Sequence, residues 1–231
     1  MISRLIAQAE RRPRLSLAIA IAAALALSWF LQTRPPPARA LTLTPVVEAV
    51  LRDRGSPRIG AEQPDVVVVV FTDYRCPICR KTDPALERLA ASDQGVQIIY
   101  KDWPILGEAS RTGARIALAA DRQGRYAEMH RLLMSERAPL SLKAAPDLAR
   151  RVGADPDKMR HALTADLASI DAQLDRHAAQ AFALGLQGTP AYLVGPYLTL
   201  GGLEEGRLAK LVARARKAGP PRPAATSQAE P

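Results

Sequence analysis

Residues 65–81 read DVVVVVFTDYRCPICRK, and this stretch decides the fold. Five consecutive valines and Phe71 form an apolar run that is too short to cross a membrane. β-Branched residues favour strands, and an unbroken apolar run is typical of a strand that is covered on both faces. Residues 81–92 then follow a helical pattern, with Leu86 and Leu89 on one side. The sequence therefore predicts a buried strand that leads into a helix.

Two cysteines stand where this helix begins, in the order Cys76-Pro77-Ile78-Cys79. Pro77 suits the first helical position, because the N–H that it lacks would have no partner within the helix. Cys76 then occupies the N-cap, where free backbone N–H groups and the helix dipole stabilise an anion. We therefore expect Cys76 to be favoured as a reactive thiolate. Cys79 lies three residues on and can close a disulfide with it.

Two other uses of a Cys-x-x-Cys pair fit the sequence less well. A structural zinc site usually has four protein ligands, and the chain offers two cysteines and three scattered histidines: His130, His161 and His177. A purely structural disulfide with so short a loop would remove little entropy from the unfolded chain. The order strand, dithiol, helix therefore favours redox chemistry.

The net charge of +9 belongs to the two ends of the chain. Residues 1–40 and 207–231 each carry a net charge of +5, whereas residues 41–206 carry −1. Aromatic residues make up only 4% of the chain, and they are not interleaved with basic ones. The composition therefore argues against a nucleic-acid-binding surface.

The N-terminal region is predicted to direct export. Residues 1–14 form a basic segment, and residues 15–31 contain no charge. Basic residues before an apolar segment place the N-terminus in the cytoplasm, so 15–33 is predicted to be an anchor in the inner membrane or the apolar region of a signal peptide. The uncleaved anchor is favoured, with cleavage after Ala40 as the alternative. Either way, the dithiol reaches the periplasm, where disulfides are permitted.

The rest of the chain divides into three predicted parts, and the second contains a helical insertion. Residues 34–60 form a linker and a short helix over 45–54, residues 61–218 form the folded domain, and residues 219–231 form a disordered tail. A helical insertion covers about 108–185.

Strand signals flank this insertion. A second strand is predicted at 96–101, and the strand–helix–strand order makes it a parallel neighbour of the valine strand. Residues 188–200 predict a hairpin with Gly195-Pro196 at its turn, and 204–217 predict a final helix.

This order of elements resembles the thioredoxin fold, and the helical insertion resembles the DsbA-like branch of thiol:disulfide oxidoreductases. Three segments carry the resemblance: FTDYRCPIC at 71–79, WPILG at 103–107 followed by Ser110, and GTPAY at 188–192. It extends over about 44–217. The implied fold class is α/β, a thioredoxin-like fold with the insertion between its β-α-β half and its cis-Pro hairpin half.

The resemblance also assigns roles. Cys76 is implied to be the attacking thiol and Cys79 the resolving thiol, while Pro77 and Ile78 between them tune the redox properties. Thr189-Pro190 is implied to carry a cis peptide bond that faces the dithiol, so that the backbone of Thr189 pairs with a substrate strand.

Two positions depart from the family pattern. Ile78 stands where the type member of the branch has a histidine, so we expect a milder oxidant. Val70 stands where relatives often carry a buried acid, and Lys101 aligns with the lysine that pairs with that acid. Lys101 is therefore expected to lack its usual partner. Asp73 or a chain of waters is a candidate replacement for the acid, and a plain surface position is the alternative for Lys101.

The expected activity is formation of disulfides in unfolded or partly folded exported proteins, with a membrane redox partner that reoxidises the dithiol. No metal or organic cofactor is expected beyond the redox-active pair Cys76–Cys79. The first alternative is a periplasmic reductase or isomerase. The second is a non-catalytic copper- or heavy-metal-binding module that uses Cys76, Cys79 and Met129. Met129, His130 and Met134 have helical spacing, however, which is more typical of core packing.

Overall fold

The computed structural model describes residues 13–32 and 37–220, and it divides the chain into two units, Met1–Pro36 and Pro37–Pro231. In the first unit the described residues form one helix, α2 (Pro13–Gln32). Within the described parts of the chain, no helix combines the length and the apolar character that a membrane crossing needs. The anchor over 15–33 therefore stays a prediction. Most of the basic segment 1–14 and of the tail 219–231 lies outside the described residues.

The second unit is built on a six-stranded sheet with the order β1-β6-β5-β3-β4-β2. β3 and β4 are parallel, as the strand–helix–strand order predicts, and every other neighbouring pair is antiparallel. The strands are β1 (Arg39–Ala40), β2 (Arg58–Gly60), β3 (Val66–Thr72), β4 (Val96–Asp102), β5 (Ala191–Val194) and β6 (Tyr197–Leu200).

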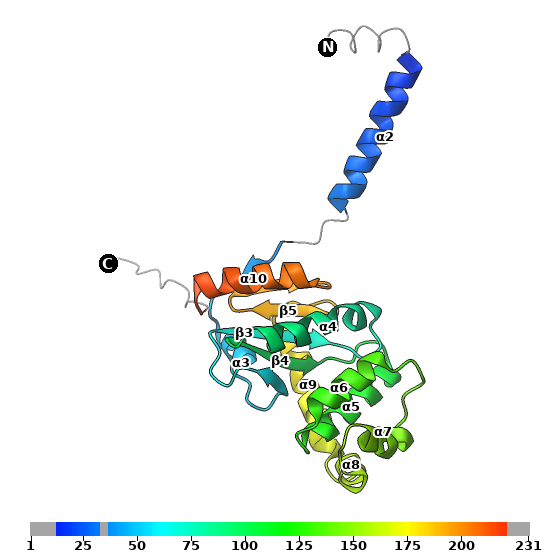
Figure 1. The fold of residues 1–231 in the computed structure, drawn as a ribbon, viewed down its shortest axis with the longest axis vertical. Helices are drawn as coiled ribbons and strands as arrows, with labels where there is room; N and C mark the ends of the chain where they lie inside the picture. The colour runs from blue at the N-terminus through cyan, green and yellow to red at the C-terminus, as the bar shows by residue number, and fades with distance from the viewer. Residues whose placement is uncertain (1–12, 33–36, 221–231) are drawn as a thin grey trace, which may run out of the picture. The chain divides into compact units, whose positions relative to one another are not determined.

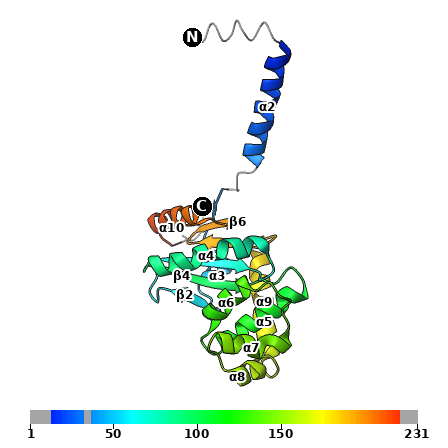
Figure 2. The same cartoon turned by 45° about the vertical axis from the view of Figure 1, so that its right-hand side comes forward.

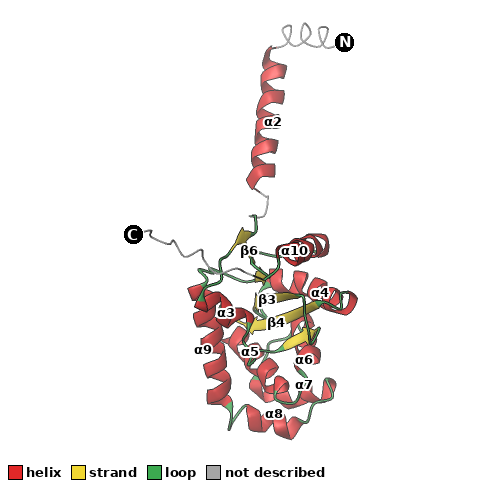
Figure 3. Cartoon of the chain, turned by 90° about the vertical axis from the view of Figure 1, so that its left-hand side faces the viewer, coloured by secondary structure: helices red, strands yellow, loops and turns green. Residues whose placement is uncertain are grey.

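The valine strand β3 lies in the middle of this sheet and is covered on both faces. Val68 and Val70 point into a large core shared with α4 (Pro77–Ser92) and α10 (Glu205–Ala218). Val69 points into a smaller core on the other face, beneath α3 (Pro45–Leu51) and α9 (Leu167–Ala183). Figure 3 shows the two pairs of helices on opposite sides of β3 and β4. An unbroken run of valines supplies apolar side chains to both cores, because successive side chains of a strand alternate between the two faces of the sheet.

The helical insertion lies between β4 and β5 in the chain. Figures 1 and 2 show α5, α6, α7 and α8 gathered as one block. Within the insertion, a 3₁₀ turn, Leu142–Ala144, precedes α7 (Ala145–Arg151), and Pro146 lies in the first turn of α7. The remaining bounds are α5 (Glu108–Asp121), α6 (Tyr126–Ser135) and α8 (Pro156–Ala162).

Residues 37–60, predicted as a linker with a short helix, belong to the compact unit. Arg39–Ala40 pairs with β6 at one edge of the sheet, and Arg58–Gly60 pairs with β4 at the other. Strands of two or three residues are too short to show an alternating pattern, which is why the sequence did not predict them.

Lys101 lies in a buried polar cluster, which we call the Lys101 cluster. Its Nζ is 2.5 Å from Asp53 Oδ2 and 2.9 Å from Ser56 Oγ, and Ser56 Oγ is 2.9 Å from His177 Nε2. Burial lowers the pKa of Lys101 to about 8 and that of His177 to about 3. Burial raises the pKa of Asp53, but Lys101 outweighs it and holds that pKa below its usual range. The cluster fastens the segment after α3 to β4 and α9.

The alternative of a plain surface position for Lys101 is therefore wrong. The alignment of Lys101 with the lysine that pairs with an acid at position 70 is also wrong, because Lys101 is the register partner of Phe71, whereas Val70 is the partner of Tyr100. Lys101 thus lies on the face of the sheet opposite to Val70. Its carboxylate partner is Asp53, a residue that the sequence did not single out.

We predict that Lys101→Met lowers the free energy of unfolding by about 3 kcal/mol, because it removes the fully buried cation from the largely buried Asp53 carboxylate and leaves only the more exposed Arg176 as an ion-pair partner. Urea denaturation of the wild type and the variant measures this. The double variant Asp53→Asn/Lys101→Met should recover part of the loss, since it removes both charges of the buried pair. A single variant as stable as the wild type would contradict the role given to this ion pair.

Candidate active site

The helix α4 begins at Pro77, and Cys76 is its N-cap, as predicted. The Cys79 N–H donates to Cys76 Sγ at 3.4 Å. Both cysteines are free thiols in this structure, with 5% and 2% of their surfaces exposed. The free N–H groups at a helix N-terminus point toward this sulfur, so the geometry suits Cys76 to nucleophilic attack.

The two thiols differ in their surroundings. Burial raises the pKa of Cys79 to about 12, and the neighbouring Cys76 sulfur acts in the same direction. Of the residues between them, Pro77 is exposed and Ile78 has 50% of its surface exposed. Ile78 therefore lies at the surface beside the dithiol, and it brings no charge to the pair.

Thr189 and Pro190 lie across from the dithiol. The peptide bond between them is cis, as the family resemblance implied. The Thr189 carbonyl oxygen is 3.4 Å from Cys76 Sγ. The structure therefore brings together Cys76, Cys79, Thr189 and Pro190, where the central strand β3 ends and its neighbour β5 begins.

Asp73 organises the loop before Cys76. Its carboxylate accepts backbone N–H groups from Arg75 at 2.7 Å, Ile105 at 2.8 Å and Leu106 at 3.0 Å. Its carbonyl oxygen accepts the Cys76 N–H at 3.1 Å. The carboxylate, considered above as a replacement for the missing acid, is thus engaged by the backbone. It fixes the dithiol loop to the segment that contains Ile105 and Leu106.

A buried polar cluster packs behind the same loop. It consists of Tyr74, Asp83, Asp102, Tyr126 and His130. Of these, the sequence drew attention only to His130, as a remote candidate for copper. Met129 and Met134 are packed in the core, and in the described parts of the chain no group of three His, Cys, Asp or Glu residues is placed to hold a metal ion.

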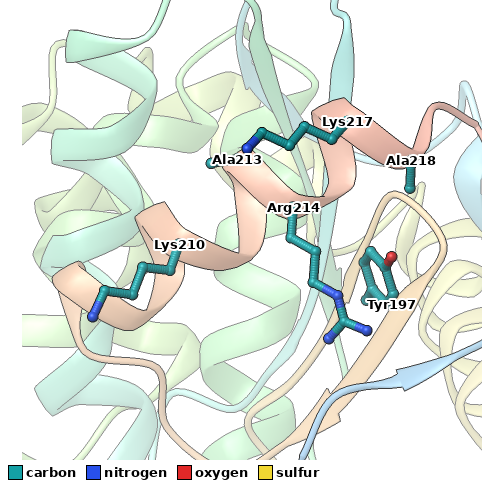
Figure 4. A pocket seen from close by; sticks show the side chains of 6 residues that line it. All are labelled: Tyr197, Lys210, Ala213, Arg214, Lys217 and Ala218. Atoms are coloured by element: carbon teal, nitrogen blue, oxygen red, sulfur yellow. The ribbon is translucent and has the colours of Figure 1, made fainter.

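An open hollow of about 510 Å³ lies between α10 and β6. Arg214 reaches from α10 over the ring of Tyr197, with 4.1 Å between its guanidinium carbon and the ring centroid (Figure 4). Tyr197 lies beside the hairpin turn, whereas Pro190 precedes the other end of β5. The hollow is therefore remote from the sulfurs. Its lining residues are Tyr197, Lys210, Ala213, Arg214, Lys217 and Ala218.

A model of the family described as the DSBA-like thioredoxin domain matches residues 67–213, more than half of the chain. The chain belongs to this family. Membership confirms the resemblance and the fold class that the sequence predicted, and the fold and dithiol are those of thiol–disulfide oxidoreductases.

Two solved structures of thioredoxin-like proteins are similar to this chain. The solved structure of a thioredoxin-like oxidoreductase from Silicibacter pomeroyi DSS-3 is 35% identical with a TM-score of 0.68, covering 74% of this chain and 97% of that one. A periplasmic thioredoxin-like protein from Salmonella enterica serovar Typhimurium is 29% identical with a TM-score of 0.64, covering 76% and 99%.

A curated relative of a different kind is the Na(+)/H(+) antiporter NhaA 1 of Salinispora arenicola. It is 27% identical over 169 residues, which are 69% of this chain and 26% of the antiporter. This chain thus spans about a quarter of the length of the curated relatives it matches.

Gly202 provides a test of how tightly the active-site helix is packed. A Cβ at this position would lie 2.7 Å from Thr82 Cγ2 and 2.9 Å from Ile78 Cγ2. We predict that Gly202→Ala lowers the free energy of unfolding by about 1–3 kcal/mol, because the side chains of Thr82 and Ile78, or α4 with them, must shift to relieve the overlap. Urea denaturation measures the change.

The matched control is Gly206→Ala within α10, where no atom lies within 4 Å of the added methyl group. This variant should be as stable as the wild type or slightly more so, because alanine favours helix. If Gly202→Ala behaves like the control, the packing of this DSBA-like domain at α4 is looser than we describe.

Proposed function

We propose that the protein is a thiol:disulfide oxidoreductase that forms disulfides in exported proteins. The observation that carries this proposal is the placement of the Cys76 sulfur at a helix N-terminus, 3.4 Å from the Thr189 carbonyl oxygen. The helix end favours the sulfur as an anion, and the backbone at Thr189 offers a hydrogen-bonding edge to an extended substrate. We assign Cys76 and Cys79 the catalytic roles, Pro77 and Ile78 the tuning role, and Thr189 and Pro190 the substrate contact.

The reaction proceeds by two exchanges. A substrate thiolate attacks Cys76 of the disulfide, and Cys79 leaves and takes up a proton. A second substrate thiolate then attacks the substrate sulfur of the mixed disulfide and releases Cys76. The substrate loses two electrons, and the enzyme dithiol gains them. The reaction draws on no metal or organic cofactor.

Exposed apolar side chains beside the dithiol support unfolded proteins as substrates. Ile78 lies in the motif, while Ile105 and Leu106 are held next to the loop by Asp73. Leu106 has 51% of its surface exposed. Apolar segments, which folded proteins bury, are exposed in partly folded chains and fit such a rim.

We place the domain in the periplasm, outside the inner membrane. The basic residues before the apolar segment 15–33, and the periplasmic relative from Salmonella, support export. In this proposal the N-terminal segment tethers the domain to the membrane, or is cleaved after Ala40. A membrane redox partner then reoxidises Cys76 and Cys79.

A second candidate is a reductase or isomerase, and Ile78 is the observation that favours it. An uncharged residue between the cysteines gives the Cys76 thiolate no additional charge stabilisation, which lowers the oxidising power of the pair. The reduction potential separates the candidates: a value near about −120 mV favours the oxidase, and one near about −270 mV favours the reductase.

Turnover of reduced, unfolded ribonuclease tests the proposed activity. We expect the wild type to restore ribonuclease activity in the presence of an oxidant, and Cys76→Ser to abolish this catalysis, because the attacked sulfur is gone. Circular dichroism of the variant checks that it is folded. A folded Cys76→Ser variant with unchanged turnover would refute the enzyme assignment.

A further inference from the structure

The cluster behind the dithiol loop, which we call the His130 cluster, joins two elements that carry the active site. His130 Nε2 lies 2.9 Å from Asp83 Oδ1 on α4, and His130 Nδ1 lies 2.8 Å from the hydroxyl of Tyr74. Tyr74 stands two residues before Cys76. Asp83 stands four residues after Cys79, so Cys79 and Asp83 are neighbours along the buried face of α4.

Hydrogen bonds continue from Tyr74 to a second carboxylate. The hydroxyls of Tyr74 and Tyr126 are 3.3 Å apart, and Tyr126 donates to Asp102 Oδ1 at 2.9 Å. The other oxygen of that carboxylate, Asp102 Oδ2, is buried without a hydrogen-bond partner in the structure. Asp102 is fully buried, and His130 has 1% of its surface exposed. The cluster is thus a hydrogen-bonded chain with a carboxylate at each end.

The hydrogen-bonded His130 cluster can accept one more proton. With Asp83 and Asp102 ionised and His130 protonated, the buried cluster carries a net charge of −1. A proton on Asp102 makes the cluster neutral, and it also lowers the cost of the unpartnered Oδ2, because a carbonyl oxygen is cheaper to bury than a carboxylate oxygen. The tyrosine hydroxyls can pass a proton between His130 and Asp102 by reversing their donor directions.

Electrostatics place this titration near neutral pH. Burial raises the pKa of Asp102 to about 7, against the opposing effects of His130 and the two tyrosine hydroxyls. Burial alone would lower the pKa of His130, but the Asp83 carboxylate outweighs burial and raises it. The other groups that face the cluster are Glu87 on α4, Asp121 on α5 and Tyr100 on β4.

We propose that the His130 cluster takes up one proton when the Cys76–Cys79 disulfide is reduced and releases it when the disulfide forms. The cluster would thereby supply the ionisable partner that Val70, on the same face of the sheet, does not. This inference rests on the proposed thiol–disulfide exchange.

The step balances. A substrate dithiol that becomes a disulfide gives up two electrons and two protons. Both electrons go to the Cys76–Cys79 bond, which breaks. One proton goes to Cys79, and Cys76 remains a thiolate at the helix N-terminus. The second proton goes to the cluster, where it offsets the new negative charge of Cys76. In the reverse direction the cluster returns this proton.

The test is the pH dependence of the dithiol–disulfide equilibrium of the full-length protein itself, measured in a glutathione redox buffer and corrected for the two protons that glutathione disulfide takes up when it is reduced. Linkage requires that each proton taken up on reduction favours the reduced form by about tenfold for each unit that the pH falls. Between about pH 6 and pH 8, where a group of pKa near 7 titrates, the wild type should show a steeper dependence than Asp102→Asn or His130→Gln. We expect the slope of at least one of these variants to be lower, by an amount that corresponds to up to one proton fewer taken up on reduction.

Asp53→Asn is the matched control. It also removes a largely buried carboxylate, but from the Lys101 cluster on the opposite face of the sheet. This variant should keep the wild-type slope even where its stability is lower. If both cluster variants keep the slope as well, the inference is wrong.

Infrared difference spectra of the wild type give an answer that does not depend on any variant folding. Reduction should produce the carbonyl band of a newly protonated carboxyl group, and its absence would overturn the inference. A protein with no measurable dithiol–disulfide equilibrium would instead refute the proposed function. A normal equilibrium without cluster titration would refute only this inference.

Discussion

The Cys76 sulfur and the Thr189 carbonyl belong to segments that are far apart in the chain, and the central sheet keeps them 3.4 Å apart. Cys76 follows the end of β3, and Thr189 precedes the start of β5. Because β3 and β5 are antiparallel neighbours, with Phe71 beside Ala191, the end of β3 lies next to the start of β5. The reactive geometry therefore depends on β3 remaining in the centre, and its valines secure this by packing into a core on each face.

The sheet also separates two buried polar clusters with different consequences. The Lys101 cluster lies with α3 and α9 and joins the N-terminal part of the unit to the sheet. The His130 cluster lies on the face of α4 and contacts the loop before Cys76. Both contain a histidine, but their surroundings shift its pKa in opposite directions: Asp83 raises that of His130, whereas burial lowers that of His177. The His130 cluster also contains Asp102, whose pKa burial raises to about 7.

The parts of the fold that could be predicted from sequence depend on local patterns. The valine run, Pro77 after Cys76 and the apolar spacing of residues 81–92 predict β3, the N-cap and α4, because each signal lies within a few residues of the structure it specifies. The cis bond at Thr189-Pro190 was inferred from family resemblance, since nothing local distinguishes it from a trans bond.

The features that the sequence did not reveal depend on tertiary contacts. Asp53 and Lys101 are 48 residues apart, and Tyr74 and His130 are 56 apart. Each pair forms only once the sheet and helices are assembled, so no local pattern marks it. Lys101 is an example: its alignment with relatives placed it opposite Val70, whereas the alternation of side chains along β4 places it on the other face of the sheet.

The central claim is that a substrate bound to Cys76 lies along the backbone of Thr189. The most direct measurement is a crystal structure of Cys79→Ala joined through a mixed disulfide to a cysteine-containing peptide, since without the resolving thiol the complex is trapped. We predict that the peptide runs as an extended strand, with its cysteine on Cys76 and its backbone hydrogen-bonded to Thr189. A peptide that is bonded to Cys76 but makes no backbone contact with Thr189 would contradict the account.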